Sequence, residues 1–382
     1  MKPLVEALRT RGVVVCVGPG GVGKTTLAAA LALQGAALGR DSLVCTIDPA
    51  RRLASALGLS ELGNIARPIS QAELKAADIH LEAPVEAMML DMKQSWDELI
   101  ARSASVEQQK RILSNRFYQS LSSVLAGSQE YIALEKLWEL HSSGAHQLVV
   151  LDTPPTAHAL DFLDAPSRVL DFLGTDTARW LLRPALRGAK LGFRLVGLGG
   201  NLISRTLARI VGGQTLSDLA AFLLAMSSLN ETFHERARAV RALLSSEETV
   251  VVLVTGPAAE RREETIRFHQ ALRDQHLQVA AVVVNQVHLG VGPTDVQAAA
   301  QLPEPLRGKL ALTISEANSL ASSDAESVQM LSAAVAPTPL LTVPRFPAQV
   351  HDLGALWRAG AYLVAAPRPP PASAARSLAP GA

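Results

Sequence analysis

Eight consecutive residues early in the chain have the types and spacing of a phosphate-binding loop. They follow the apolar run Val13–Val17 and are Gly18, Pro19, Gly20, Gly21, Val22, Gly23, Lys24 and Thr25, which satisfies the pattern GxxxxGK[ST]. The glycines allow successive backbone N–H groups to wrap around phosphate oxygens, and a following helix adds the positive end of its dipole. The competing interpretation is a glycine-rich turn without a ligand, which the strand before the loop and the helix after it disfavour. The sequence therefore predicts a nucleotide phosphate site.

The side chains at the end of this loop have distinct predicted roles. Lys24 supplies a point charge for the β- and γ-phosphates, Thr25 is the expected Mg²⁺ ligand, and Thr26 is expected at the α-phosphate. The backbone expected to hold the phosphates belongs to Gly20, Gly21, Val22 and Gly23. ATP and Mg²⁺ are thus the predicted ligands.

Two carboxylates follow apolar runs that have the composition of buried strands. Asp152 comes directly after Leu148–Leu151, the position expected for a carboxylate that organises Mg²⁺ through a water molecule, although a turn or helix-capping role is the simpler alternative. Asp48 comes after Leu43–Ile47 and could position or deprotonate the attacking water. From the residues alone, Asp48 is equally compatible with an ordinary turn.

Short apolar runs recur along the chain and predict the strands of a parallel sheet. The six predicted strands are Val13–Val17, Leu43–Ile47, Leu148–Leu151, Val250–Val254, Val279–Val284 and Leu340–Val343. Helical patterns over Thr25–Leu38 and Glu260–Gln275 lie between strands, so the predicted fold class is α/β, with a doubly wound, mainly parallel sheet. Ligands of such sheets gather at the carboxyl ends of the strands.

Two long stretches, about 84–140 and 160–243, have helical periodicity without clear strand candidates. We interpret them as a helical subdomain inserted into one P-loop domain that covers residues 1–366. The remaining residues, 367–382, are rich in Pro, Ala and Ser, which is typical of a disordered tail.

Composition narrows the class of protein. The 382 residues include 36 basic and 35 acidic side chains, so no overall charge excess indicates a nucleic-acid partner. The two cysteines, Cys16 and Cys45, lie in predicted strands, which excludes a disulfide framework and favours a reducing, cytoplasmic setting. The N-terminal residues have no apolar signal core, and the longest apolar run, Leu219 to Met226, is too short to span a bilayer.

Four segments of the chain resemble the deviant P-loop ATPases that include the arsenite-pump ATPase ArsA and the eukaryotic targeting factor for tail-anchored membrane proteins. The segments are GPGGVGKTT (18–26), TIDPARRL (46–53), DTPPTAHALDFL (152–163) and VVNQ (283–286), with VPRFP (343–347) after the last. The resemblance covers about residues 12–360. Its most specific segment is DTPPTAH, which begins at Asp152 and is similar to the DTAPTGHT switch of the family. LAGSQEYIALEKLWEL (125–140) is similar to a bacterial branch of this group.

The resemblance implies a role for each matching residue. Asp48 acts on the hydrolytic water, and Asp152 organises Mg²⁺. Asn285 reads the adenine edge, for which its amide offers both a donor and an acceptor, and the backbone near Pro344 and Phe346 closes over the base. A strand-end cap is the simpler alternative for Asn285. The residues that would sense the γ-phosphate are Thr153, Pro155, Thr156 and His158, and for His158 a hydrogen bond that shapes the loop is favoured over chemistry.

The chain departs from the family at its phosphate loop. The family loop usually carries a first lysine that reaches across a dimer to the other subunit's nucleotide, and this position is Pro19 here. Arg51 or Arg52 could replace the missing charge, although a solvated basic pair is the simpler interpretation. Cys16 and Cys45 match neither the metalloid thiols of arsenite-responsive members nor a CxxC zinc clasp, so both functions are disfavoured.

The resemblance implies an ATP-hydrolysing homodimer whose helical subdomain binds a client. Ala165–Ser217 contains eight basic and two acidic residues among apolar ones. This stretch is compatible with a simple helical core layer, a groove for a hydrophobic client, or docking at a membrane surface, which would make a cytoplasmic protein peripheral to the membrane. The rival functions are a nucleotide-dependent binding switch with negligible turnover, which Pro19 keeps open, and a partition-type ATPase, which the balanced charge disfavours.

Overall fold

The computed structural model describes residues 3–47, 52–59, 61–115, 118–119, 128–154, 165, 222, 229–348 and 350–364. Several predictions lie outside these residues, or outside the side chains that are described. They concern Asp48, Arg51, the Arg52 side chain, Pro155, Thr156, His158, nearly all of 165–217 and 219–226, and the tail 367–382.

The chain divides into two compact units. The sheet unit comprises Met1–Met89, Ser143–Leu160 and Leu244–Ala382, and the helical unit comprises Leu90–Ser142 and Asp161–Leu243. Among the described residues, no helix combines the length and the hydropathy that crossing a bilayer requires.

The sheet unit contains an eight-stranded sheet in the order β3-β4-β2-β5-β1-β6-β7-β8, in which only the β3–β4 pair is antiparallel. The strands are β1 (Val13–Val17), β2 (Ser42–Thr46), β3 (Arg67–Pro68), β4 (Val85–Met89), β5 (Leu148–Asp152), β6 (Thr249–Thr255), β7 (Val279–Val287) and β8 (Leu340–Pro344). All six predicted strands are present, with bounds that differ by up to three residues.

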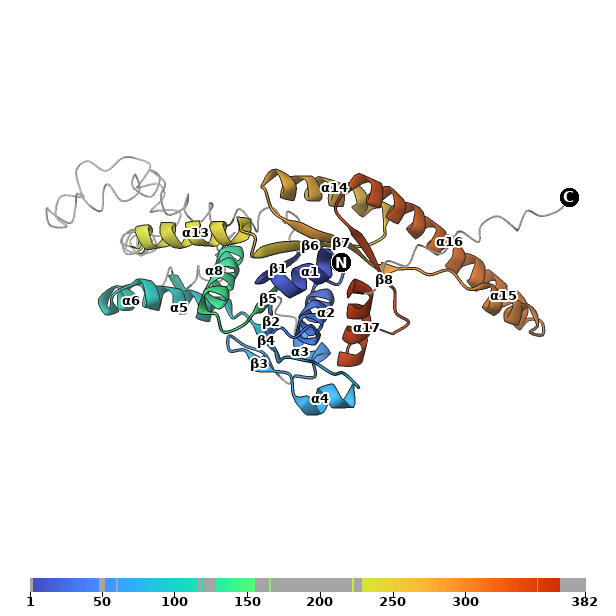
Figure 1. Cartoon of the computed structure of the whole chain (residues 1–382), viewed down its shortest axis with the longest axis horizontal. Helices are drawn as coiled ribbons and strands as arrows, with labels where there is room; N and C mark the ends of the chain where they lie inside the picture. Colours follow the sequence, from blue (N-terminus) through green and yellow to red (C-terminus); the bar gives the residue numbers. More distant parts are fainter. Residues whose placement is uncertain are drawn as a thin grey trace, which may run out of the picture. The chain divides into compact units, whose positions relative to one another are not determined.

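Helices cover both faces of this sheet. Its helices are α1 (Pro3–Thr10), α2 (Lys24–Ala37), α3 (Arg52–Ala56), α4 (Gln71–Ala76), α14 (Ala259–Asp274), α15 (Pro293–Ala300), α16 (Leu306–Ala334) and α17 (Leu353–Val364). Helices α1, α2 and α17 pack together, and α14 and α16 pack on β6 and β7 (Figure 1). The predicted α/β class with a mainly parallel sheet is confirmed.

Burial explains why these segments form central strands. Every residue of β1, β2, β5 and β6 is buried, and most of them are Val or Leu. Strands covered by helices on both faces bury both sets of side chains, so their sequences are continuous apolar runs.

The expectation that residues 84–140 contain no strand is wrong at the start of this stretch. β4 pairs in parallel with β2, and the helical unit begins after it. Its sequence VEAMM contains one β-branched residue and a glutamate, so the run lacks the composition that marked the other strands. The Glu86 carboxylate accepts a hydrogen bond from Nε2 of His146 at 2.9 Å, which offsets the cost of partly burying this side chain.

The helical unit consists of helices with an aromatic core. The described helices are α5 (Met92–Ser103), α6 (Val106–Leu113), α8 (Ser128–Ser143) and α13 (Asn230–Ser245), the last residues of α8 and α13 lying in the sheet unit. Trp96, Tyr131 and Phe233 come from three of these helices, and their ring centroids lie 6.0–6.3 Å apart. Aromatic packing of this kind stabilises the contact between the helices beyond the burial of area alone.

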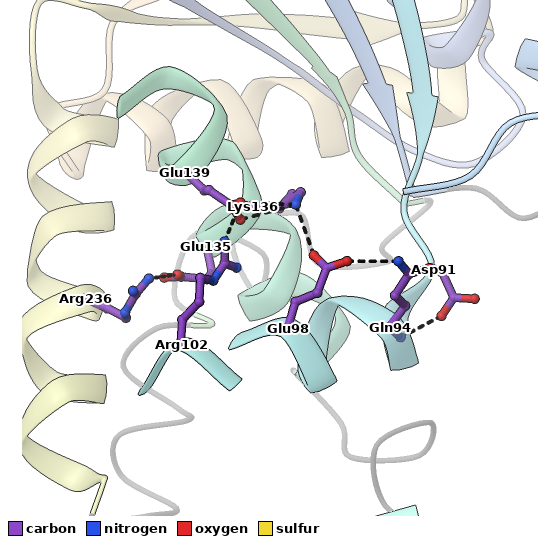
Figure 2. Close-up of polar contacts among 8 residues, drawn as sticks. All are labelled: Asp91, Gln94, Glu98, Arg102, Glu135, Lys136, Glu139 and Arg236. Carbon is purple, nitrogen blue, oxygen red and sulfur yellow. Dashed lines mark hydrogen bonds and ion pairs between the residues drawn. The ribbon is translucent and has the colours of Figure 1, made fainter. Parts of the chain in front are cut away.

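Charged side chains also join these helices (Figure 2). Glu135 on α8 is 1% exposed and forms an ion pair with Arg236 of α13. Lys136, also on α8, lies 3.2 Å from Glu98 of α5, and Arg102 of α5 pairs with Glu139. The contacts among these helices therefore combine apolar packing with several partly buried ion pairs.

Candidate nucleotide site

Strand pairing brings Thr46 and Asp152 together at the carboxyl edge of the sheet. The two residues are register partners in neighbouring parallel strands, and each is 1% exposed. The hydroxyl of Thr46 donates to Oδ2 of Asp152 at 2.7 Å. A buried carboxylate is thereby held by a neutral donor at the edge where ligands of α/β sheets bind.

The first turn of α2 meets the same carboxylate. The Thr25 hydroxyl donates to Oδ2 of Asp152 at 2.6 Å, so the two residues predicted to organise Mg²⁺ are in contact. Thr26, predicted at the α-phosphate, lies beside Thr25 in the first turn and is partly buried. The contact connects two chain positions that are 127 residues apart.

The lysine of the loop is almost fully buried. Lys24 is 6% exposed, and its ammonium group donates to the carbonyls of Gly18 at 2.9 Å and Pro19 at 3.1 Å. A buried ammonium requires partners of this kind. The lysine closes the loop upon itself and places its positive charge inside the loop.

Two glycines of the loop cannot be replaced without displacing backbone or a predicted site residue. Gly18 has φ +145°, and a Cβ placed there would lie 1.9 Å from the carbonyl oxygen of Val254 in β6. Gly23 has φ +91°, and a Cβ there would lie 2.4 Å from Nδ2 of Asn285. Gly23 also caps α2 without offering a side-chain acceptor, so the first-turn amides face the loop as they do in phosphate sites.

Asn285 of β7 holds the phosphate loop in place through a hydrogen bond. It lies in β7, is 7% exposed, and donates its amide to the carbonyl of Val22 at 2.8 Å. The residue that the family resemblance assigned to adenine thus contacts the phosphate loop directly. Its amide oxygen has no role in that bond.

The predicted base-closing segment lies next to the end of β7. Pro344 is the register partner of Val287, and the Arg345 amide donates to the Val287 carbonyl at 2.9 Å. Phe346 is partly buried and packs edge-on against Tyr362 of α17, with ring centroids 6.1 Å apart. The structure therefore brings the Pro344 and Phe346 segment to the strand that carries Asn285.

Thr153 begins the segment predicted to sense the γ-phosphate. It is 3% exposed, and both its hydroxyl and its amide donate to the carbonyl of Cys16, at 2.8 and 3.3 Å. Burial, followed by the charge of Asp152, raises the pKa of the Cys16 thiol, which keeps that thiol neutral.

Two residues of the site were not predicted from the sequence. The sequence marks Thr46 only as the first residue of the segment TIDPARRL, although its position at the end of a buried strand is a usable signal. Arg261 of α14 donates to the Gly20 carbonyl at 3.2 Å, which brings a guanidinium to the loop that carries Pro19. No local pattern marks Arg261, because its contact spans 241 residues of sequence.

The donor set fits Mg²⁺. A hydroxyl and a carboxylate lie together beside the phosphate loop, and Mg²⁺ is usually bound by one or two carboxylates together with substrate phosphates and waters. Within the part of the chain that the structure describes, no three His, Cys, Asp or Glu side chains are grouped to hold a metal, an arrangement that zinc would favour.

Comparisons with known proteins identify the family of the chain. Residues 11–297 match the family model of the anion-transporting ATPases, the ArsA ATPases. The chain is 30% identical over 275 residues to ATPase get3 of Aspergillus terreus, covering 71% of each chain. It is 29% identical over 273 residues to ATPase GET3 of Paracoccidioides lutzii, again covering 71% of each.

A third relative matches a shorter segment at a higher identity. ATPase GET3 of Malassezia globosa is 33% identical over 154 residues, which are 40% of this chain and 42% of the relative. The family model covers most of the chain, including the phosphate loop, Asp152 and Asn285. By sequence and by fold, this chain belongs to the ArsA family of anion-transporting ATPases and is an ATPase.

Proposed function

We propose that this ATPase hydrolyses ATP with Mg²⁺ and uses the reaction to change the conformation of its helical unit. The observation that carries the proposal is the contact of Thr25 with Asp152, because it joins the phosphate loop to the strand that leads into residues 152–158. A change of phosphate occupancy at Thr25 acts directly on the first residue of this segment. The segment also leads along the chain into the helical unit, whose second part begins at Asp161.

Each site residue has a proposed role in phosphoryl transfer. Lys24 and the loop amides stabilise charge on the phosphates, and Asp48 orients the attacking water. Thr25 and Asp152 would hold Mg²⁺, the former directly and the latter through a water molecule, and the bound ion would neutralise charge on the phosphate oxygens. Catalysis in this class depends mostly on positioning and charge stabilisation.

The base site is proposed at Asn285 and the Pro344–Phe346 segment. The Asn285 amide nitrogen holds the loop at Val22, while its oxygen would accept from the exocyclic amine of adenine. One residue would then couple binding of the base to the geometry of the loop. Thr153, Pro155, Thr156 and His158 are the proposed sensor of the γ-phosphate.

The partners are proposed from the family. A homodimer forms around ATP, and the helical unit binds a hydrophobic or membrane-surface client, as the resemblance to targeting factors for tail-anchored proteins implies. A cytoplasmic protein, peripheral to the membrane when it carries a client, fits this function. The resemblance of residues 125–140 to a bacterial branch belongs to the same proposal, and the relatives named above are fungal.

A nucleotide-dependent binding switch with negligible turnover is the second candidate, and Pro19 favours it. Proline supplies no charge at the position where the family carries its cross-subunit lysine. The two candidates share the ATP site and differ only in the rate of hydrolysis.

Steady-state ATP turnover with Mg²⁺, measured beside the solution mass with and without ATP, tests the proposal. We expect Asp48→Asn to lower turnover at least about 100-fold while ATP still binds and drives dimer formation. Asp41→Asn, an acidic residue at the amino end of β2, is the matched control and should retain turnover. A parent protein that dimerises with ATP but does not hydrolyse it would make the binding switch the function.

A further inference from the structure

Two peptide groups of the phosphate loop are held from outside by side chains of other elements. The Asn285 amide donates to the Val22 carbonyl at 2.8 Å, and the Arg261 guanidinium donates to the Gly20 carbonyl at 3.2 Å. Asn285 lies in one of the segments that resemble the family, whereas Arg261 lies in none of them. Arg261 therefore contacts the nucleotide site without an assigned role.

The peptide between Gly20 and Gly21 has few other contacts that fix its orientation. Both residues are exposed, and Gly21 has φ +76° with no other group within 4 Å of where a Cβ would lie. A peptide between two glycines rotates readily, since neither residue has a side chain. Among the hydrogen bonds of the described residues, the Gly20 carbonyl accepts the one from Arg261. A single side chain of α14 thus sets the direction in which this peptide faces.

That direction matters for phosphate binding. The carbonyl and the N–H of a trans peptide point to opposite sides, and the bond between Gly20 and Gly21 is trans. Because the Arg261 guanidinium holds the Gly20 carbonyl on the side of α14, the Gly21 amide points away from α14. Backbone amides of such a loop are the donors that bind phosphate oxygens. A cation at the carbonyl also polarises the peptide, which makes its N–H a stronger donor.

The backbone of Arg261 is itself fixed by hydroxyl groups. Thr265 is 2% exposed and donates to the Arg261 carbonyl at 2.7 Å. This bond uses the only hydroxyl hydrogen of Thr265, so Thr255, the last residue of β6, is the donor in the 2.8 Å contact between the two hydroxyls. A Cβ placed at Gly256 would lie 3.8 Å from Cδ of Arg261, so the side chain passes close to the end of β6. A buried network therefore directs Arg261 to the loop.

We propose, on the basis of the ATP site proposed above, that Arg261 is a positioning residue of this ATPase. It holds the Gly20 carbonyl so that the Gly21 amide faces the phosphates of the bound nucleotide. A guanidinium keeps its charge at every pH that the protein experiences. Arg261 thus brings a permanent positive charge to a loop in which Pro19 supplies none.

The contact should act on nucleotide binding more than on folding. It is one hydrogen bond from a partly buried side chain to an exposed loop, and such a bond contributes little to the stability of the fold. The amide that it orients, in contrast, is expected to bind charged phosphate oxygens, and hydrogen bonds to charged groups are the stronger ones. Affinity, turnover and stability are therefore the three quantities to separate.

Arg261→Ala in the full-length protein is the first test. We expect the dissociation constant for Mg-ATP, from titration with a fluorescent ATP analogue, to rise about tenfold and kcat to fall about tenfold. Arg262→Ala is the matched control, because it removes the same charge from the next position of α14, where the side chain donates to the sulfur of Met330 at 3.1 Å. This control should retain the affinity and the turnover of the parent.

Arg261→Lys tests whether a charged donor is what the site requires. The contact is a single hydrogen bond to a carbonyl rather than a bidentate pair, so an ammonium can replace it. We expect both the affinity and kcat of Arg261→Lys to lie within about threefold of the parent. A lysine variant as impaired as Arg261→Ala would contradict the role of a charged donor at the Gly20 carbonyl.

Thr265→Val tests whether the hydroxyl network acts through Arg261. Alone, it should weaken ATP binding about threefold, because the Arg261 carbonyl loses its partner; in the Arg261→Ala background it should have no further effect. Equal effects of Thr265→Val in the two backgrounds would show that Thr265 acts through packing and would contradict positioning through Arg261.

The melting temperature of the nucleotide-free protein completes the experiment. We expect it to be the same for the parent, Arg261→Ala and Arg262→Ala. Unchanged affinity and kcat in Arg261→Ala would overturn the proposal, as would equal losses in Arg262→Ala or a loss that follows a lower melting temperature.

The outcomes also separate this proposal from the ATPase mechanism. A parent that binds ATP without hydrolysing it would contradict the proposed hydrolysis, while the affinities would still test Arg261. Normal hydrolysis in both the parent and Arg261→Ala would contradict only the role of Arg261. A parent that binds no ATP would contradict both.

Discussion

In the sheet unit the buried polar side chains of Thr46, Asp152 and Asn285 lie on strands, whereas in the helical unit buried charges lie between helices. The Asp152 carboxylate accepts hydrogen bonds from the hydroxyls of Thr25 and Thr46, and the Asn285 amide donates to the backbone carbonyl of Val22. Glu135, by contrast, depends on Arg236 from another helix. Strand pairing fixes the polar groups of the first region, while the second region depends on ion pairs whose desolvation cost is close to their attraction.

This difference predicts distinct responses to substitution. In the sheet unit, a lost polar contact should change catalysis more than folding, because the hydrogen bonds between strands remain. In the helical unit, a lost ion pair should change stability and its pH dependence, because a charge is left in an apolar environment.

Asp152→Asn should produce the largest effect. We expect a loss of about 10³-fold in ATP turnover, since the change removes the charge that the proposed Mg²⁺ site requires. Thr46→Val removes one donor to the same oxygen and should cost roughly tenfold. Turnover assays and thermal melts of both variants check this. A large fall in melting temperature with turnover intact would show that these polar contacts support folding rather than catalysis.

Gly18→Ala should be the most destabilising glycine substitution of the loop. The new methyl group would overlap the Val254 carbonyl, so we expect a loss of about 4 kcal/mol in the free energy of unfolding. Gly39→Ala is the matched control, since Gly39 also has a positive φ, +83°, but no other group lies within 4 Å of where its new methyl group would be, and about 1 kcal/mol is expected. Denaturant titration measures both, and equal losses would show that backbone conformation alone matters.

Arg236→Ala should destabilise the helical unit by about 3 kcal/mol at pH 7.5, because it leaves the buried Glu135 without its partner. Burial raises the pKa of Glu135 even with Arg236 present, so the carboxyl binds its proton more tightly in the folded protein than in the unfolded chain. A raised folded pKa means that stability increases as the pH falls through that pKa toward the ordinary value of 4.5. The cost of Arg236→Ala should therefore shrink between pH 7.5 and pH 5.

Glu135→Gln in the Arg236→Ala background is the control for this pH dependence. The double variant has no titrating carboxyl at this position, so its own free energy of unfolding should lack the part of the pH dependence that Glu135 causes. Melting temperatures at several pH values give the measurement. If the stability of the single and double variants depends equally on pH, Glu135 does not cause the pH dependence of the Arg236→Ala variant.

Lys93→Ala should have the smallest effect. Lys93 and Asp97 form an exposed ion pair on α5, with side chains 56% and 34% exposed. Solvent screening and side-chain entropy reduce such pairs to about 0.3–0.5 kcal/mol. A denaturant titration that finds a loss above about 1 kcal/mol would show that this surface is more ordered than its exposure indicates.

The sequence by itself determined the phosphate loop and most of the sheet. Val13–Val17 and the glycines after it are local signals, and the central strands are continuous apolar runs because helices cover both of their faces. Local patterns did not identify β4, whose composition is mixed, and no helix was predicted at α16. The predicted metal and phosphate residues Lys24, Thr25 and Asp152 lie together at one edge of the sheet.

Only the tertiary structure decided which polar groups meet across the sheet. Thr46 reaches Asp152 because β2 and β5 are neighbours in parallel register, although 106 residues separate the two side chains in the chain. Arg261 reaches Gly20, and Asn285 reaches Val22, across even longer separations. Local propensity carries no information on such pairs, because strand order and helix packing, rather than the neighbouring residues, bring their atoms within hydrogen-bonding distance.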